Sequence, residues 1–94
     1  MTLGPRIGRK KDSTHDAIVN ALEECGAKVV DLHKLGGSVP DLFVTVGTRF
    51  TFAECKSGRA KLTPGQADFA KEHPVKVLRS VAEAVQMVTD MRTT

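Results

Sequence analysis

The chain has 94 residues, of which 40% are hydrophobic, and its formal net charge is +3. This length leaves room for one domain with a modest core, and the hydrophobic content excludes a disordered chain. No apolar stretch approaches the roughly 20 residues of a membrane span and no signal-peptide core follows the N-terminus, so we expect a cytoplasmic protein without membrane contact. The two cysteines lack the spacing of a zinc site or a disulfide framework, so we expect two free thiols.

Apolar periodicity and turn residues predict a small α/β domain over residues 13–94, with the element order αβββαβα and a central mixed sheet flanked by helices. Gly26 can end the first helix, Gly47-Thr48 predicts an antiparallel hairpin, and Thr63-Pro64-Gly65-Gln66 is typical of a capped helix start. In chain order we expect a helix over 13–25, strands over 28–32, 41–46 and 49–56, a helix from 64 to about 73, a strand over 75–78 and a last helix from 81. The first helix carries one apolar stripe: Ala17, Ile18, Ala21, Leu22 and Cys25.

Basic residues cluster within residues 1–12, which we expect to form a flexible basic arm, and again between residues 56 and 61. Clusters of this kind contact the phosphate backbone of nucleic acids, whereas a solvated tail and a charged surface loop are the alternative interpretation. The candidate DNA-binding residues are Arg9, Lys10, Lys11, Arg59 and Lys61.

Charged residues also lie at one end of two neighbouring strands. Asp41 opens the second expected strand, and Glu54 and Lys56 close the third. Because residues two apart in a strand share a face, Glu54 and Lys56 project together, at the end of an apolar row formed by Phe50 and Phe52. A charge in such a position is costly unless it is paired or holds a metal, and a cation between the two carboxylates would explain it.

Three segments carry these residues in a recognisable order: Gly37-Ser38-Val39-Pro40-Asp41-Leu42, Ala53-Glu54-Cys55-Lys56 and Leu62-Thr63-Pro64-Gly65-Gln66. Together they resemble the PD-(D/E)xK nuclease superfamily, and most closely a small stand-alone, phage-type member of its virus-type replication-repair nuclease (VRR-NUC) branch. The resemblance covers residues 12–90 and implies a restriction-endonuclease-like core in a bacterial or phage-infected cell.

The resemblance implies a Mg²⁺- or Mn²⁺-dependent endonuclease that hydrolyses phosphodiester bonds in DNA. Asp41 and Glu54 would hold the cation together with the backbone carbonyl of Cys55, because hard cations prefer oxygen ligands. Lys56 would position or help deprotonate the attacking water and offset the developing negative charge. Gln66 would help hold metal-bound water or phosphate, which completes the expected catalytic set.

The superfamily often adds a residue of the first helix to the metal site. Here His15 is favoured, because relatives of this type carry a polar residue near the start of that helix; an exposed first-turn histidine is the alternative. Asp16, Asn20 and Glu23 are the other candidates.

Small members of the branch also resemble Holliday-junction resolving enzymes, which implies branched DNA as the partner and a homodimer as the working form. The last helix is a candidate interface, although packing on the sheet would explain most of its apolar residues: Val81, Val85, Val88 and Met91.

Each motif residue also has a simpler interpretation. Asp41 could cap a turn after Pro40, Glu54 and Lys56 could form an ordinary ion pair, and Gln66 could only complete a capping box. The Cys55 thiol is expected to be packed and not nucleophilic, since no histidine is near it in the sequence. A catalytically inactive nucleic-acid-binding domain and a small interaction protein are therefore the alternative functions.

Overall fold

The computed structural model describes residues 13–93 and confirms the α/β class and the order αβββαβα, with one short 3₁₀ helix in addition. The elements are α1 (Ser13–Glu24), β1 (Lys28–Asp31), η1 (His33–Leu35), β2 (Leu42–Val46), β3 (Arg49–Cys55), α2 (Pro64–Glu72), β4 (Val75–Leu78) and α3 (Val81–Thr93). The expected boundaries differ from these by a single residue at several ends. Within residues 13–93, no helix is both long enough and apolar enough to cross a membrane.

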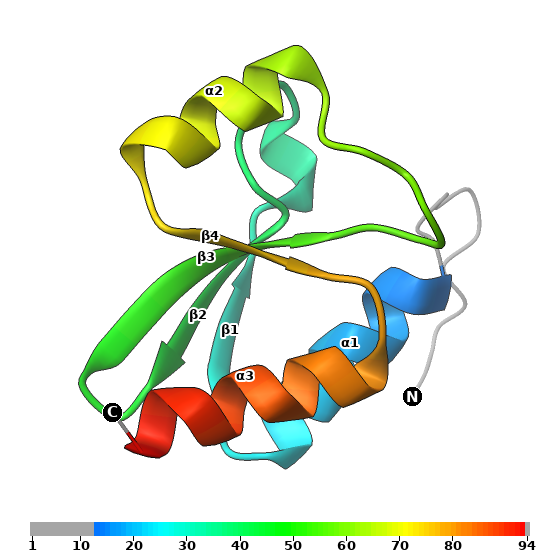
Figure 1. Cartoon of the computed structure of the whole chain (residues 1–94). Coiled ribbons are helices and arrows are strands. Elements are labelled where there is room, and N and C mark those ends of the chain that lie inside the picture. Colours follow the sequence, from blue (N-terminus) through cyan, green and yellow to red (C-terminus); the bar gives the residue numbers. More distant parts are fainter. Residues whose placement is uncertain (1–12, 94) are drawn as a thin grey trace.

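The strands form one mixed sheet in the order β1-β2-β3-β4. β2 is antiparallel to both β1 and β3, and β4 joins β3 in parallel after the crossover through α2. α1 and α3 lie side by side on one face of the sheet, and α2 lies on the other face (Figure 1). Gly47, with φ of +62°, permits the two-residue turn between Val46 and Arg49.

The hydrophobic core lies between the sheet and the pair α1 and α3. Ile18 and Leu22 of α1 are fully buried against Leu42 and Val44 of β2, as the apolar stripe of the first helix predicts. Ala17, which was expected in that stripe, is exposed. The other core residues are Ala21, Ala27, Val46, Ala53, Leu78, Ala84, Met87 and Val88.

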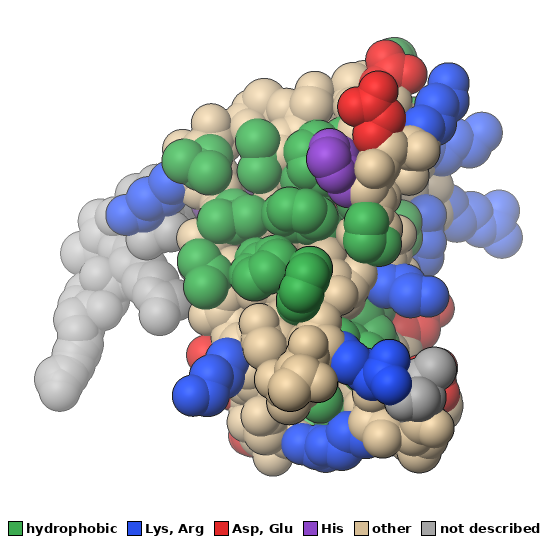
Figure 2. Space-filling model, turned by 90° about the vertical axis from the view of Figure 1, so that its left-hand side faces the viewer, with side chains coloured by type: hydrophobic (Ala, Val, Ile, Leu, Met, Phe, Trp, Pro, Cys, Tyr) green, Lys and Arg blue, Asp and Glu red, His purple; other side chains and the backbone are tan. Residues whose placement is uncertain are grey.

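The opposite face of the sheet is also apolar, although most of it is open to solvent. A row of directly paired residues crosses all four strands on this face: Val30, Phe43, Phe52 and Val75. Phe69 of α2 covers one end of the row, with its ring centroid 5.2 Å from that of Phe52, while Val30 and Phe50 are 56% and 63% exposed. Hydrophobic side chains gather on this side of the molecule (Figure 2), and we call Val30, Phe43, Phe50 and Phe52 the open sheet face.

Candidate functional site

The pairing of β2 with β3 brings Asp41 and Glu54 together. Leu42 pairs with Ala53 across the antiparallel strands, and the same register, continued one residue outward, sets Asp41 opposite Glu54. Glu54 Oε1 accepts a hydrogen bond of 3.2 Å from the Asp41 N–H. Asp41 Oδ2 accepts one of 3.0 Å from the Cys55 N–H. Each carboxylate is thus fixed by a backbone N–H group of the neighbouring segment.

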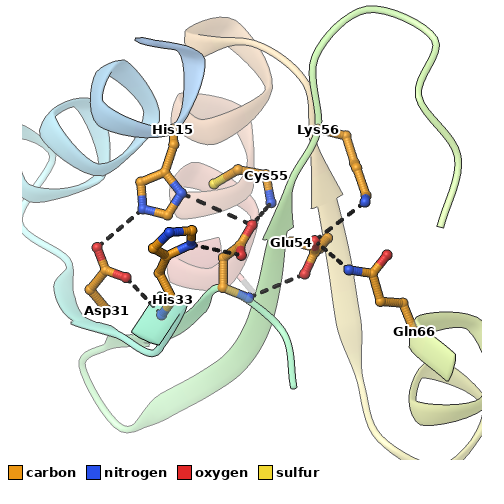
Figure 3. Close-up of polar contacts among 8 residues, drawn as sticks. His15, Asp31, His33, Glu54, Cys55, Lys56 and Gln66 are labelled. Carbon is orange, nitrogen blue, oxygen red and sulfur yellow. Dashed lines mark hydrogen bonds and ion pairs between the residues drawn. The ribbon is translucent and has the colours of Figure 1, made fainter. Parts of the chain in front are cut away.

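Glu54 is buried beside polar side chains. The residue is 3% exposed, and its Oε2 accepts a hydrogen bond of 3.0 Å from Gln66 Nε2 and lies 3.6 Å from Lys56 Nζ (Figure 3). Burial raises the pKa of Glu54, and the negative charge of Asp41 raises it further, while the Asp41 N–H and the Lys56 cation act in the opposite direction. The contacts of Glu54 with the Asp41 N–H and Lys56 therefore offset only part of the free-energy cost of burying its ionised carboxylate.

Gln66 caps α2 and also contacts Glu54, while its expected role toward metal-bound water or phosphate stays a prediction. Its Oε1 accepts from the Thr63 N–H at 2.9 Å, and Thr63 Oγ1 accepts from the Gln66 N–H at 3.2 Å, which completes the capping box of α2. The Nε2 of the same side chain donates to Glu54. Since the cap fixes one end of the amide, the other end is held toward Glu54.

The loop before β2 meets the start of α2. A Cβ atom on Gly65 would lie 2.1 Å from Ser38 Oγ, so glycine at this position permits the close approach of the two segments. The first and third motif segments are thereby neighbours in space, and the strand that carries Glu54 lies beside both.

Of the four candidates on the first helix, His15 is the one in contact with Asp41. It is 4% exposed, and its Nδ1 lies 4.0 Å from Asp41 Oδ2. The alternative of an exposed first-turn histidine is therefore wrong. Asn20 and Glu23 are exposed on α1.

Sequence analysis missed two residues of this region, Asp31 and His33. Asp31 Oδ2 lies 3.1 Å from His15 Nε2, and its Oδ1 accepts a hydrogen bond of 2.9 Å from the His33 N–H. His33 Nδ1 lies 3.9 Å from Asp41 Oδ1. The available signal was the position of Asp31 at the end of β1, where it pairs with Leu42 next to Asp41.

The Cys55 thiol is half-buried, as expected, and forms no disulfide among residues 13–93, but it is not remote from histidine. α1 brings His15 to it, and donor atoms of His15, Asp41 and Cys55 all lie within 4.8 Å of one another. The assignment of the Cys55 backbone carbonyl as a metal ligand stays a prediction.

The basic segment after β3 forms a loop whose backbone is held in place. Arg79, a residue without a role in sequence analysis, donates from Nη1 to the carbonyl oxygens of Gly58 at 3.0 Å and Ala60 at 2.7 Å. Arg59 and Lys61 are exposed on this loop. The other candidates for DNA binding, Arg9, Lys10 and Lys11, lie outside the described residues, as does the expected arm over residues 1–12.

The charge balance of the carboxylate pair fits a hard divalent cation. Among residues 13–93, Lys56 is the only lysine or arginine within ion-pair distance of Asp41 or Glu54, and it contacts Glu54. Asp41 has His15 and His33 near it, at 4.0 and 3.9 Å. Two neighbouring carboxylates, one of them buried, have a single ammonium group beside them. Mg²⁺ or Mn²⁺ could bind to their oxygen atoms and balance the remaining negative charge.

A comparison with models of protein families finds no match for this chain, and a comparison with curated proteins finds none either. The resemblance to the VRR-NUC branch therefore depends on the motif residues and on the element order.

The raised pKa of Glu54 makes the stability of the metal-free protein depend on pH. Because its pKa in the folded state lies above the ordinary value of 4.5, protonated Glu54 stabilises the fold fully below about pH 4.5, and this contribution is lost as the pH rises through the raised pKa. Urea unfolding in EDTA should show the wild type losing stability relative to Glu54→Gln with increasing pH, by up to about 1.4 kcal/mol per pH unit. If the difference in unfolding free energy between the two proteins stayed constant with pH, the raised pKa of Glu54 would be contradicted.

Proposed function

We propose that this protein is a Mg²⁺- or Mn²⁺-dependent DNA endonuclease of the VRR-NUC type, which acts on branched DNA such as Holliday junctions. The observation that carries the proposal is the position of Asp41 beside the buried Glu54, with Lys56 and Gln66 in contact with the same carboxylate. Capping, an ion pair and a turn would each explain one of these residues. These separate explanations do not account for the contacts that Asp41, Lys56 and Gln66 all make with the buried carboxylate of Glu54.

Asp41 and Glu54 would hold the cation, with the Cys55 carbonyl as a further ligand. When bound, the cation would supply Lewis-acid activation of the scissile phosphate and of a water molecule. The backbone N–H groups that bond both carboxylates keep them in position before any ligand arrives. Gln66 restricts the rotation of the Glu54 carboxylate from the opposite side.

Lys56 is suited to stabilise charge at the reacting phosphate. Its side chain is 15% exposed and its ammonium group lies 3.6 Å from Glu54, so the lysine is held at the site and is still reachable. An ammonium group in a partly dehydrated site donates to a phosphate oxygen and offsets the negative charge that develops during attack by water. Its position beside Glu54 also allows it to orient that water.

DNA would be bound through its phosphates by the basic loop that follows Lys56. Arg59 and Lys61 are exposed there, and Arg79 holds the loop backbone from below, so the two cations are kept near the catalytic end of β3. The residues Arg9, Lys10 and Lys11 remain part of the proposed DNA contact on the grounds of their charge.

A homodimer would present two such sites to the two strands that are cut in a four-way junction, because a two-fold axis relates both the sites and the strands. The open sheet face supports this arrangement: it is apolar, it continues along β3 up to Glu54, and it includes Phe50, an aromatic residue that is 63% exposed. On α3, Val88 and Met91 pack in or against the core, and only Val81 and Val85 of the expected interface are exposed. We therefore assign the open sheet face to a second copy of the chain.

Cleavage assays test the proposed chemistry. Labelled four-way junction, flap, single-stranded and linear duplex DNA would be incubated with the protein in Mg²⁺, Mn²⁺ or EDTA. We expect metal-dependent cleavage of the junction, abolished by Asp41→Ala and reduced about 10²-fold or more by Lys56→Ala. Lys71→Ala is the matched control, because Lys71 is an exposed lysine of α2 that pairs only with Asp68 among residues 13–93.

Three results of these assays would contradict the account in different ways. Cleavage of flaps or single strands alone would keep the nuclease and refute the junction preference. Normal cleavage by Lys56→Ala would refute the proposed role of this lysine. Tight DNA binding in EDTA without any cleavage would favour an inactive nucleic-acid-binding domain.

The dimer is tested by the mass of the protein in solution. The chain has a mass of 10.1 kDa, and light scattering should give twice this value for the wild type. Phe50→Lys should shift the mass to that of the monomer, because it places a charge within the proposed apolar contact. Val85→Lys, on the exposed side of α3, should leave the dimer intact; the opposite pattern would place the interface on the last helix.

A further inference from the structure

A second group of potential metal ligands lies on the side of Asp41 away from Glu54. Donor atoms of His15, Asp41 and Cys55 are within 4.8 Å of one another. His33 Nδ1 lies 3.9 Å from the other oxygen of Asp41. Figure 3 shows His15 and His33 together on one side of the site and Glu54 with Gln66 on the other. Asp41 belongs to both groups, and Cys55 supplies its thiol to this one while its backbone carbonyl is a proposed ligand at the Mg²⁺ position.

The orientation of His15 is that of a metal ligand. Its Nε2 lies 3.1 Å from Asp31 Oδ2, and because a carboxylate oxygen only accepts, Nε2 carries the proton. In the neutral ring, Nδ1 then presents its lone pair toward Asp41 Oδ2 at 4.0 Å, too far for a hydrogen bond. Whenever the ring is neutral, two acceptor atoms therefore face each other at a residue that is 4% exposed. A carboxylate behind the far nitrogen of a histidine is the usual support of a metal-bound imidazole.

Asp31 also positions the second histidine. Its Oδ1 accepts a hydrogen bond of 2.9 Å from the His33 N–H, so one carboxylate fixes the ring of His15 and the backbone of His33. The two rings meet edge to face, with centroids 5.4 Å apart. The His33 side chain is 43% exposed, and this side of the cluster provides a path for an ion from solvent.

The donor types select a class of metal ion. Two imidazoles, a thiol and a carboxylate suit Zn²⁺ and similar borderline ions, whereas Mg²⁺ requires oxygen ligands. With metal–ligand bonds of about 2.0–2.3 Å, the ligands of one tetrahedral ion lie roughly 3–4 Å apart. The separations of 3.9 and 4.0 Å in this cluster are at this limit, and the donor atoms of His15, Asp41 and Cys55, all within 4.8 Å of one another, would need only small movements to reach it.

We propose that His15, His33, Asp41 and Cys55 form a binding site for Zn²⁺ or a similar transition-metal ion, with Asp31 as the residue that orients both histidines. On binding, the Cys55 sulfur–hydrogen bond breaks, its proton leaves to solvent, and the thiolate sulfur forms a bond to the metal. The oxidation state of the metal remains unchanged, and no electron is transferred.

Occupation of this site would have a regulatory effect, which rests on the proposed nuclease function. A transition-metal ion bound to Asp41 competes for the carboxylate that the Mg²⁺ position needs. Zn²⁺ should therefore inhibit cleavage in the presence of Mg²⁺, and Cys55→Ser should relieve part of this inhibition.

Titration of the reduced, full-length protein with Co²⁺ tests the site without any reference to cleavage. Co²⁺ adopts the geometry of Zn²⁺ sites, and bonding to a thiolate produces a sulfur-to-cobalt charge-transfer band in the near ultraviolet. We expect this band in the wild type, its loss on addition of Zn²⁺, and its persistence in excess Mg²⁺. Asp31→Asn should weaken Co²⁺ binding about 10- to 100-fold, since it removes the charge behind His15.

The two cysteines provide a matched pair of variants. Cys55→Ser should abolish the charge-transfer band, and Cys25→Ser, at the far end of α1, should retain it. Absence of the band in the wild type, or its persistence in Cys55→Ser, would overturn the proposal. Circular dichroism of each metal-free variant checks the fold. Since the wild-type spectrum needs no nuclease activity, failure of the cleavage assays would leave this test intact.

Discussion

Asp41 and Glu54 lie beside each other because Leu42 pairs with Ala53 in the antiparallel pair β2 and β3. Their side chains are then fixed reciprocally, since Glu54 accepts from the backbone of Asp41 and Asp41 accepts from the backbone of Cys55. A shift of this register by one residue would turn every side chain of the strand to the opposite face and separate the two carboxylates. The hydrophobic residues of β2 oppose such a shift, because the alternate residues Leu42 and Val44 are fully buried against α1 and α3.

The burial of Glu54 has a cost that the contacts of the site offset only partly. Burial and the neighbouring Asp41 raise its pKa, while Lys56 and a backbone N–H favour the ionised form. A divalent cation would shift this balance further toward ionisation, so proton binding and metal binding at Glu54 oppose each other. Asp41 occupies the boundary between this oxygen-rich environment and the cluster of His15, His33 and Cys55. The chemistry of its neighbours on the two sides favours different metals, and this boundary is where competition between them would occur.

The sequence was sufficient to predict the order of the elements, the hairpin and the meeting of Asp41 with Glu54, because these depend on local periodicity, turn residues and strand alternation. The capping box of Gln66 was also within reach of the sequence, whereas its hydrogen bond to Glu54 became visible only in the fold. Asp31 and His33 were missed because their roles depend on which residue of α1 faces the end of β1, and this is set by packing. For the same reason Cys55, which has no histidine near it in the sequence, has His15 beside it in the fold.

The central claim is that the buried carboxylate pair binds a divalent cation, and Mn²⁺ binding measured by electron paramagnetic resonance tests it most directly. Free Mn²⁺ gives a signal that decreases when the ion binds, so the affinity can be followed without DNA. We expect the wild type to bind Mn²⁺ and Glu54→Gln to bind it at least about tenfold more weakly, because the variant removes a charged oxygen ligand. Glu72→Gln, a change at an exposed glutamate of α2, should bind like the wild type. Equal Mn²⁺ affinity in the wild type and Glu54→Gln would contradict the metal site and the nuclease chemistry that depends on it.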